Sequence, residues 1–402
     1  MVFGSNLSIG SFPRLPSSPG SPGLGSGPTA QSQTSPPSPD EVCLGAGPEP
    51  LPSRPSASLL YIIDHFQAPG TLSLPGPFAV IEQAVQTGMT HGDSVVQAAR
   101  SQGYSGPIKG VESSPPPSED VPAYLKIWLS SDDPQMLSLC LTESMVSHRA
   151  ETLSQMERNL QRILNEFPVN SVVNLSAGSG QSNLVQVSLA MMRGNDPENI
   201  EERKKVFDER RRVALALGLD AEKFCSDNRE ERDQIWPDVV QGLLDRAAAT
   251  EQDARVKLAK AAYDQTVGTL TSWGNLVVVS AGNEQQLPGF LEEDFGDGRK
   301  FQFSPHFIGN DLVSSDTIAV GALHQGKVAE YSSRLPSVRI YASGDLGEDQ
   351  GTSMAAPRVA AVLAGLKGAE PSLDASSAQQ RLRQHYCIQQ EVDSQPAYFL
   401  RP

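Results

Sequence analysis

Short, continuously apolar runs alternate with longer segments of helical periodicity along most of the chain. Runs of strand length lie at residues 58–64, 78–81, 125–129, 171–175 and 275–280. Continuously apolar strands are typical of a parallel sheet that is covered on both faces. The intervening segments carry apolar residues at three- and four-residue steps, which indicates amphipathic helices. This alternation predicts an α/β fold, doubly wound, with a mostly parallel central sheet flanked by helices.

Two regions depart from this alternation. Residues 1–57 are rich in proline, glycine and serine. A segment of this composition cannot bury enough apolar surface to offset its ordering entropy, so a disordered tail is predicted. Residues 106–120 are rich in proline, serine and acidic side chains and are predicted to form a loop. Charged helices are predicted at 196–218, 229–248 and 251–270, where runs of Glu, Arg and Lys are typical of solvent-exposed helical faces.

The composition excludes several classes of function. The chain of 402 residues has 32 basic and 47 acidic side chains and a net charge of -15. Such a surface repels nucleic acid and anionic membranes, so neither is an expected partner. No run of eighteen apolar residues occurs, and residues 1–8 lack a basic start and an apolar core, so no signal peptide is predicted. We therefore expect a cytoplasmic protein, or one exported without a recognisable signal. No paired spacing indicates a metal site among the cysteines, which are Cys43, Cys140, Cys225 and Cys387.

The most informative segment spans residues 351–367. Ser353 stands at the start of a run of alanine, valine and leucine that is interrupted once, by Pro357. This pattern predicts a buried helix with the serine in its first turn. The free N–H groups and the positive dipole end of a helix favour developing negative charge, so this serine is a candidate nucleophile.

The string from Gly351 to Pro357, Gly-Thr-Ser-Met-Ala-Ala-Pro, resembles the nucleophile motif of the subtilisin-like serine proteases, the subtilase or peptidase S8 family. The resemblance implies a serine endopeptidase that hydrolyses peptide bonds in proteins and needs no cofactor for its chemistry. In the same way, His91-Gly92 resembles the start of the family's His-Gly-Thr-His motif, and Asp64 resembles the family's acid. A catalytic triad of Asp64, His91 and Ser353 follows, in the chain order of subtilisins.

Further motifs extend the resemblance to residues 58–370. Asn283 in Ser-Ala-Gly-Asn resembles the family's oxyanion donor and precedes the serine by 70 residues, a separation similar to the family's. The resemblance also implies that an extended substrate pairs with the segment Ser176, Ala177 and Gly178. His91 and Asn283 are much farther apart than in compact members. We therefore predict a peptidase domain over residues 58–402 that carries a helical insertion at 181–260.

The motifs depart from the family's pattern in places. Asp64 is followed by His65 and Phe66 instead of Ser/Thr-Gly, and the segment at His91 lacks the second histidine. Glu82 is a rival acid, but it lies only nine residues before His91, whereas Asp64 leaves room for an intervening strand. His65 is the one other histidine placed to compete as the base, since His148, His306, His324 and His385 lie outside any motif.

Two alternative functions remain. A catalytically silent relative would bind extended peptides without cutting them. A sedolisin-type acid protease shares Gly-Thr-Ser but uses Glu as base and Asp at the oxyanion, which His91 and Asn283 oppose. Absence of a recognisable inhibitory prodomain suggests a separate protein inhibitor as a partner. Family members commonly bind calcium for stability, but the acidic segment 292–298 lacks EF-hand spacing and is predicted to be a solvated loop.

Overall fold

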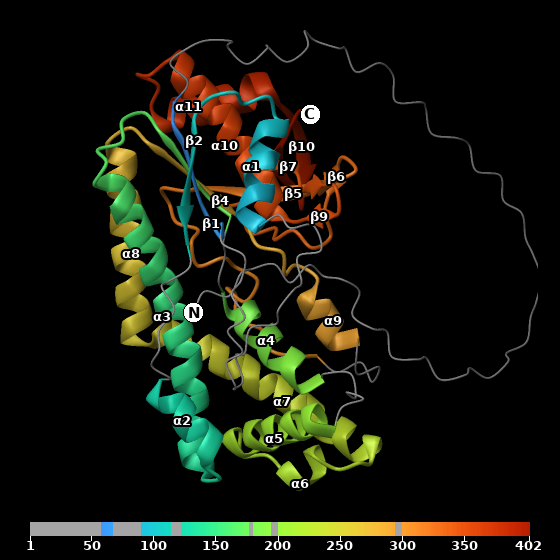
Figure 1. Ribbon diagram of the computed structural model, residues 1–402. Coiled ribbons are helices and arrows are strands. Elements are labelled where there is room, and N and C mark those ends of the chain that lie inside the picture. Colours follow the sequence, from blue (N-terminus) through green and yellow to red (C-terminus); the bar gives the residue numbers. More distant parts are fainter. Residues whose placement is uncertain (1–57, 67–89, 114–121, 177–179, 194–199, 294–299) are drawn as a thin grey trace, which may run out of the picture.

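The computed structural model describes residues 58–66, 90–113, 122–176, 180–193, 200–293 and 300–402 (Figure 1). The predicted tail at 1–57, the predicted strand at 78–81 and the rival acid Glu82 lie outside the described residues. Within the described part of the chain, none of the helices is long and apolar enough to cross a membrane.

The centre of the described structure is a nine-stranded, mostly parallel sheet. Its strand order is β10-β11-β7-β5-β4-β3-β1-β2, with β6 paired to β5. Among the described pairings of this sheet, only those of β10 with β11 and of β6 with β5 are antiparallel. The strands are β1 (Leu60–Asp64), β2 (Ile108–Glu112), β3 (Val172–Leu175), β4 (Leu276–Ser280), β5 (Ile318–His324), β6 (Lys327–Val328), β7 (Ile340–Ser343), β10 (Cys387–Val392) and β11 (Gln395–Leu400). A separate hairpin joins β8 (Asp345–Leu346) to β9 (Asp349–Gln350).

Helices cover both faces of this sheet, as the apolar runs predict (Figure 1). In β1, Leu60 and Ile62 enter the core on one face, and Tyr61 and Ile63 enter the core on the other. Helices α1 (His91–Ser101) and α10 (Thr352–Ala369) cover the first face, and α11 (Ala375–Arg381) joins them. Helices α3 (Pro134–Leu164) and α8 (Ala254–Ser272) pack together over the second face. The predicted doubly wound α/β class is confirmed.

A second group of helices lies beside the sheet and encloses its own apolar core (Figure 1). The group comprises α2 (Ala123–Ser130), α4 (Gln181–Arg193), α5 (Ile200–Ala216), α6 (Ala221–Phe224), α7 (Arg229–Ala249) and α9 (Leu287–Glu293). The N-terminal half of α3 packs with them, and a short 3-10 turn, Thr250–Gln252, links α7 to α8. This core also includes residues of α2 and α3, which precede residue 181, so it does not delimit a separate unit at 181–260. The insertion at 181–260 therefore stays a prediction.

Two local predictions were wrong. Residues 125–129 lie in the helix α2 instead of a strand, because Leu125 and Trp128, three residues apart, bury on the same helical side. The predicted loop at 106–120 contains the edge strand β2. Its Gly110 lets the strand pass close to Phe66, since an added Cβ would lie 2.8 Å from that ring.

Candidate active site

The carboxyl ends of three neighbouring parallel strands lie at one edge of the sheet, and Asp64, Ser176 and Asn283 lie at or just after these ends. Pairing of Ile63 with Leu175, and of Leu175 with Val279, aligns β1, β3 and β4 at this edge of the sheet. Asp64 ends β1 and Ser280 ends β4. The edge beyond the carboxyl ends of parallel strands is where ligands bind in open α/β folds.

His91 is the first residue of α1, and its position is fixed from both sides. Thr90 caps the helix through a capping box, in which its hydroxyl accepts from the Asp93 N–H and the Asp93 carboxylate accepts from the Thr90 N–H. The Gly92 N–H donates to the carbonyl oxygen of His65 at 2.8 Å. A Cβ at Gly92 would lie 2.8 Å from that oxygen, so the residue after the histidine must be small.

Asp64 and His91 form a close pair. The His91 Nδ1 lies 2.6 Å from Oδ1 of Asp64, and the same oxygen accepts a hydrogen bond from the His65 N–H at 2.7 Å. The Asp64 residue is 1% exposed. Burial by itself lowers the pKa of His91, but the charge and hydrogen bond of Asp64, together with the charge of Asp349, raise this pKa above its ordinary value. The His91 Nε2 has no hydrogen-bond partner among the described residues, so it is available to take a proton.

Ser353 lies in the first turn of α10 and is 3% exposed. Pro357 has no N–H, so the helix cannot supply the usual donor to the carbonyl of the residue four positions earlier, which is Ser353. The Ser176 hydroxyl supplies that donor instead, at 3.0 Å, and itself accepts from the Asn174 side chain at 2.8 Å. The proline of the motif and the serine after β3 are therefore complementary.

Asn283 is oriented by the same helix start. Its Oδ1 accepts from the Thr352 N–H at 2.8 Å and from the Thr352 hydroxyl at 3.0 Å. Since a backbone N–H can only donate, the amide oxygen must face Thr352, and Nδ2 is left to point elsewhere. A Cβ on Gly351 would lie 3.0 Å from Ser353 Oγ and 3.2 Å from Asn283 Nδ2. The serine oxygen and the amide nitrogen thus converge on one small volume.

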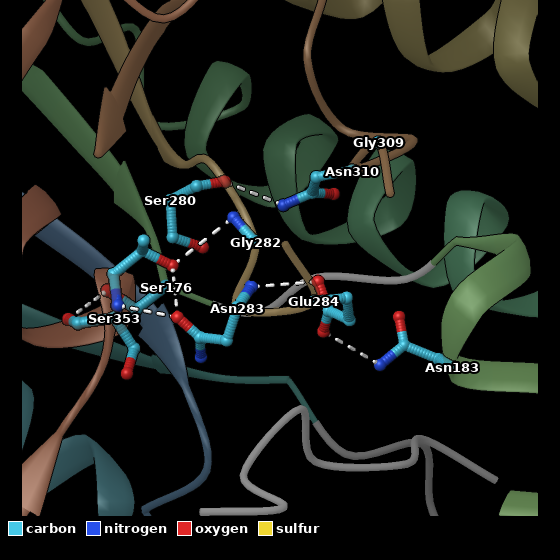
Figure 2. A pocket seen from close by; sticks show the side chains of 10 residues that line it. Ser176, Asn183, Ser280, Gly282, Asn283, Glu284, Gly309, Asn310 and Ser353 are labelled. Atoms are coloured by element: carbon cyan, nitrogen blue, oxygen red, sulfur yellow. Dashed lines mark hydrogen bonds between the residues drawn. The ribbon is translucent and has the colours of Figure 1, made fainter. Parts of the chain in front are cut away.

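Figure 2 shows the pocket around this point. The described residues that line it are Ser176, Asn183, Ser280, Gly282, Asn283, Glu284, Gly309, Asn310, Thr352 and Ser353. Three polar residues of this lining, Asn183, Glu284 and Asn310, were not predicted from the sequence. Glu284 accepts from the Asn283 N–H at 2.7 Å and from the Asn183 side chain at 3.3 Å, and burial raises the pKa of its carboxyl. The Asn310 side chain donates to the carbonyl of Ser280 at 2.7 Å. An acid directly after Asn283 was the one available signal.

His65 does not take the place of His91. Its ring lies 3.1 Å from the Ser113 hydroxyl and 3.6 Å from Glu112, and burial lowers its pKa. Ala177 and Gly178 lie outside the described residues, so the predicted substrate segment is described only at Ser176. Among the described residues, no group of three or more His, Cys, Asp or Glu side chains is arranged to hold a metal ion. Most of the acidic segment 292–298 lies outside them.

Comparison with known protein families gives a match over part of the chain. A family model of peptidase S8, described as the subtilase family, matches residues 170–395, more than half of the chain. The matched region includes Asn283 and Ser353, whereas Asp64 and His91 precede it. No curated protein matches the chain.

Two solved structures are similar in part. One is the nisin leader peptidase NisP from Lactococcus lactis, with 13% identity, a TM-score of 0.35, and coverage of 87% of each chain. The other is the epidermin leader peptide processing serine protease EpiP from Staphylococcus aureus, with 12% identity, a TM-score of 0.35, and coverage of 86% of this chain and 75% of that one.

Proposed function

The chain belongs to the subtilase family of serine endopeptidases, and from this premise we propose that its chemistry runs through Asp64, His91, Ser353 and Asn283. The observation that carries the proposal is the 2.6 Å contact between Asp64 Oδ1 and His91 Nδ1, which joins residues from a strand end and a helix start. This contact fixes the imidazole so that Nε2 is the nitrogen left for proton transfer.

The first step is attack by Ser353 on the substrate carbonyl. His91 Nε2 takes the proton of the Ser353 hydroxyl as Oγ forms its bond to the carbonyl carbon. The imidazolium that results is stabilised by the buried carboxylate of Asp64. The developing oxyanion accepts hydrogen bonds from Asn283 Nδ2 and from the Ser353 N–H, which is one of the free donors of a helix start.

The second step releases the products. The imidazolium donates its proton to the leaving amine as the peptide C–N bond breaks, and water then hydrolyses the acyl-enzyme by the reverse sequence of proton transfers. Subtilases need no cofactor for this chemistry. The substrate is an extended peptide that lies along the segment from Ser176 to Gly178. The Ser176 hydroxyl is engaged with the nucleophile's carbonyl, so backbone groups of this segment carry the pairing.

Active-site labelling tests this proposal. Wild type should react with a fluorophosphonate probe and cleave an unfolded protein substrate at neutral pH. Ser353→Ala should lose both activities, and Asp64→Ala should lose most of both. Ser372→Ala, at an exposed serine, is the matched control and should behave as wild type.

The outcomes separate the alternatives. A folded wild-type protein that takes no label but binds peptides would make the chain a silent relative. Activity confined to acidic pH would favour the sedolisin-type mechanism, because a histidine base requires its neutral form. Peptide-library profiling of the labelled enzyme then defines its sequence preference.

A further inference from the structure

A second carboxylate lies near the candidate base. Asp349 belongs to β9 of the short hairpin that leads into the nucleophile helix, and it is exposed. Its Oδ2 accepts a hydrogen bond at 2.8 Å from the hydroxyl of Ser94, which is 6% exposed. Ser94 lies three residues after His91 in α1, so both side chains fall on the same side of that helix. The bond connects segments that are 255 residues apart in the chain.

We propose that Asp349 is a positioning residue for catalysis: its hydrogen bond with Ser94 holds the helix of the base against the loop of the nucleophile, and its charge stabilises the imidazolium of His91. This inference rests on the proposed function. Asp349 does not touch the reacting atoms, and it acts through His91.

The geometry supports both parts. Helices α1 and α10 pack against each other. The Ser94–Asp349 hydrogen bond lies near the N-terminal ends of both helices, which bear His91 and Ser353. A side-chain bond between two elements restricts their relative shift, and small shifts of reacting groups cost large factors in rate. Ser94 occupies the position of the second histidine in the His-Gly-Thr-His motif. The hydroxyl that bonds to Asp349 therefore comes from a residue at which this chain differs from the motif.

The charges around His91 set the sign of the electrostatic effect. The described titratable groups near it are Asp64 on β1, His65 after β1, Asp349 on β9 and Asp93 on its own helix. The carboxylate of Asp349 favours the protonated imidazole, so removing its charge lowers the pKa of His91. Loss of the charge therefore moves the acidic limb of the kcat/KM profile to lower pH and weakens the stabilisation of the imidazolium in the transition state.

Two variants separate charge from position. Asp349→Asn removes the charge while its amide oxygen can still accept from Ser94. We expect the acidic limb to move down by about 0.3 to 1 pH unit, and the difference from wild type to shrink in 1 M salt, because an exposed charge is screened. Ser94→Ala keeps the charge and removes the bond. We expect kcat to fall about three- to tenfold with little change in KM, and Ser94→Thr to restore it. Glu348→Gln, an exposed neighbour with the same charge change, is the control and should match wild type.

Opposite results overturn the inference. If the acidic limb of the kcat/KM profile lies at the same pH in Asp349→Asn and Glu348→Gln, the charge of Asp349 does not act on His91. If Ser94→Ala keeps wild-type kcat, the bond does not position the base. The His91 ring should also be titrated by NMR, with its signal assigned by its loss in His91→Gln. A wild type that takes no fluorophosphonate label refutes the proposed function, yet the NMR titration still decides whether Asp349 raises the pKa of His91.

Discussion

Replacing Asn283 by leucine tests the oxyanion donor most directly. Leucine has nearly the same size and shape as asparagine but offers neither a donor nor an acceptor. The substitution removes Nδ2, which converges with Ser353 Oγ on the volume beside Gly351. It also removes Oδ1, which accepts two hydrogen bonds from Thr352. One change thus acts on both the reaction and the fold, and the two effects must be measured separately.

The structure sets the expected size of each effect. Loss of one preorganised donor to an oxyanion lowers kcat by about 10²- to 10³-fold, which corresponds to about 2.7–4 kcal/mol. KM should change little, because the donor acts on charge that develops only in the transition state. Thr352 is 1% exposed, so leaving its N–H and hydroxyl without an acceptor should lower the free energy of unfolding by about 1–3 kcal/mol.

Steady-state kinetics and urea unfolding on the same preparation provide the assay, with kcat corrected for the fraction of folded protein. Thr352→Val is the companion variant: it removes one of the two bonds that orient the Asn283 amide but keeps Nδ2. We expect its kcat to fall by about tenfold or less. A folded Asn283→Leu enzyme with kcat within threefold of wild type would refute the assignment of Asn283 as the donor.

Three other predictions follow from buried contacts. Because the charge and hydrogen bond of Asp64 raise the pKa of His91, the acidic limb of the wild-type kcat/KM profile should lie above the ordinary histidine pKa of about 6.5. Asp64→Asn should lower kcat by about 10⁴-fold in the same kinetic assay. Arg149→Met should lower the free energy of unfolding by about 3–5 kcal/mol in urea titrations, because it leaves Asp311 without its bidentate partner at 2.6 and 2.7 Å; an unchanged midpoint would contradict this. Ser176→Ala should cost about 1–3 kcal/mol by the same assay, since the nucleophile's carbonyl loses its donor, whereas Ser176→Thr should retain most of the stability.

The parts of the fold that could be predicted from the sequence are those with a local pattern. The continuously apolar runs at 58–64, 171–175 and 275–280 correspond to β1, β3 and β4, because each buries side chains on both faces of the sheet. The helix after Thr90 was predictable as well, since its apolar residues follow helical spacing. Asp64 and His91 were paired through their resemblance to the family's motifs, and the two side chains are in contact in the structure.

The remaining features depend on contacts between distant segments. The run at 125–129 is apolar enough for a strand or a helix, and the core of the helical group decides in favour of α2. Strand β2 has a glycine and exposed positions, so its pattern is weak, and pairing with β1 defines it. The Arg149–Asp311 pair joins residues that are 162 positions apart and shows no sequence signal. Such contacts are set by the assembled fold.

Pro357 illustrates why a motif is more than its local conformation. By sequence alone, a proline in the first half of a buried helix is tolerated only as a small loss of backbone bonding. In the assembled site, the missing N–H frees the carbonyl of Ser353, and Ser176, 177 residues earlier, donates to it. The strand end that bears Ser176 is thereby fixed to the nucleophile's own backbone. A proline that weakens its helix thus ties the nucleophile to the strand beside which the substrate is proposed to lie. In this chain, the four-residue spacing of Ser353 and Pro357 leaves the carbonyl of Ser353 open to the Ser176 hydroxyl.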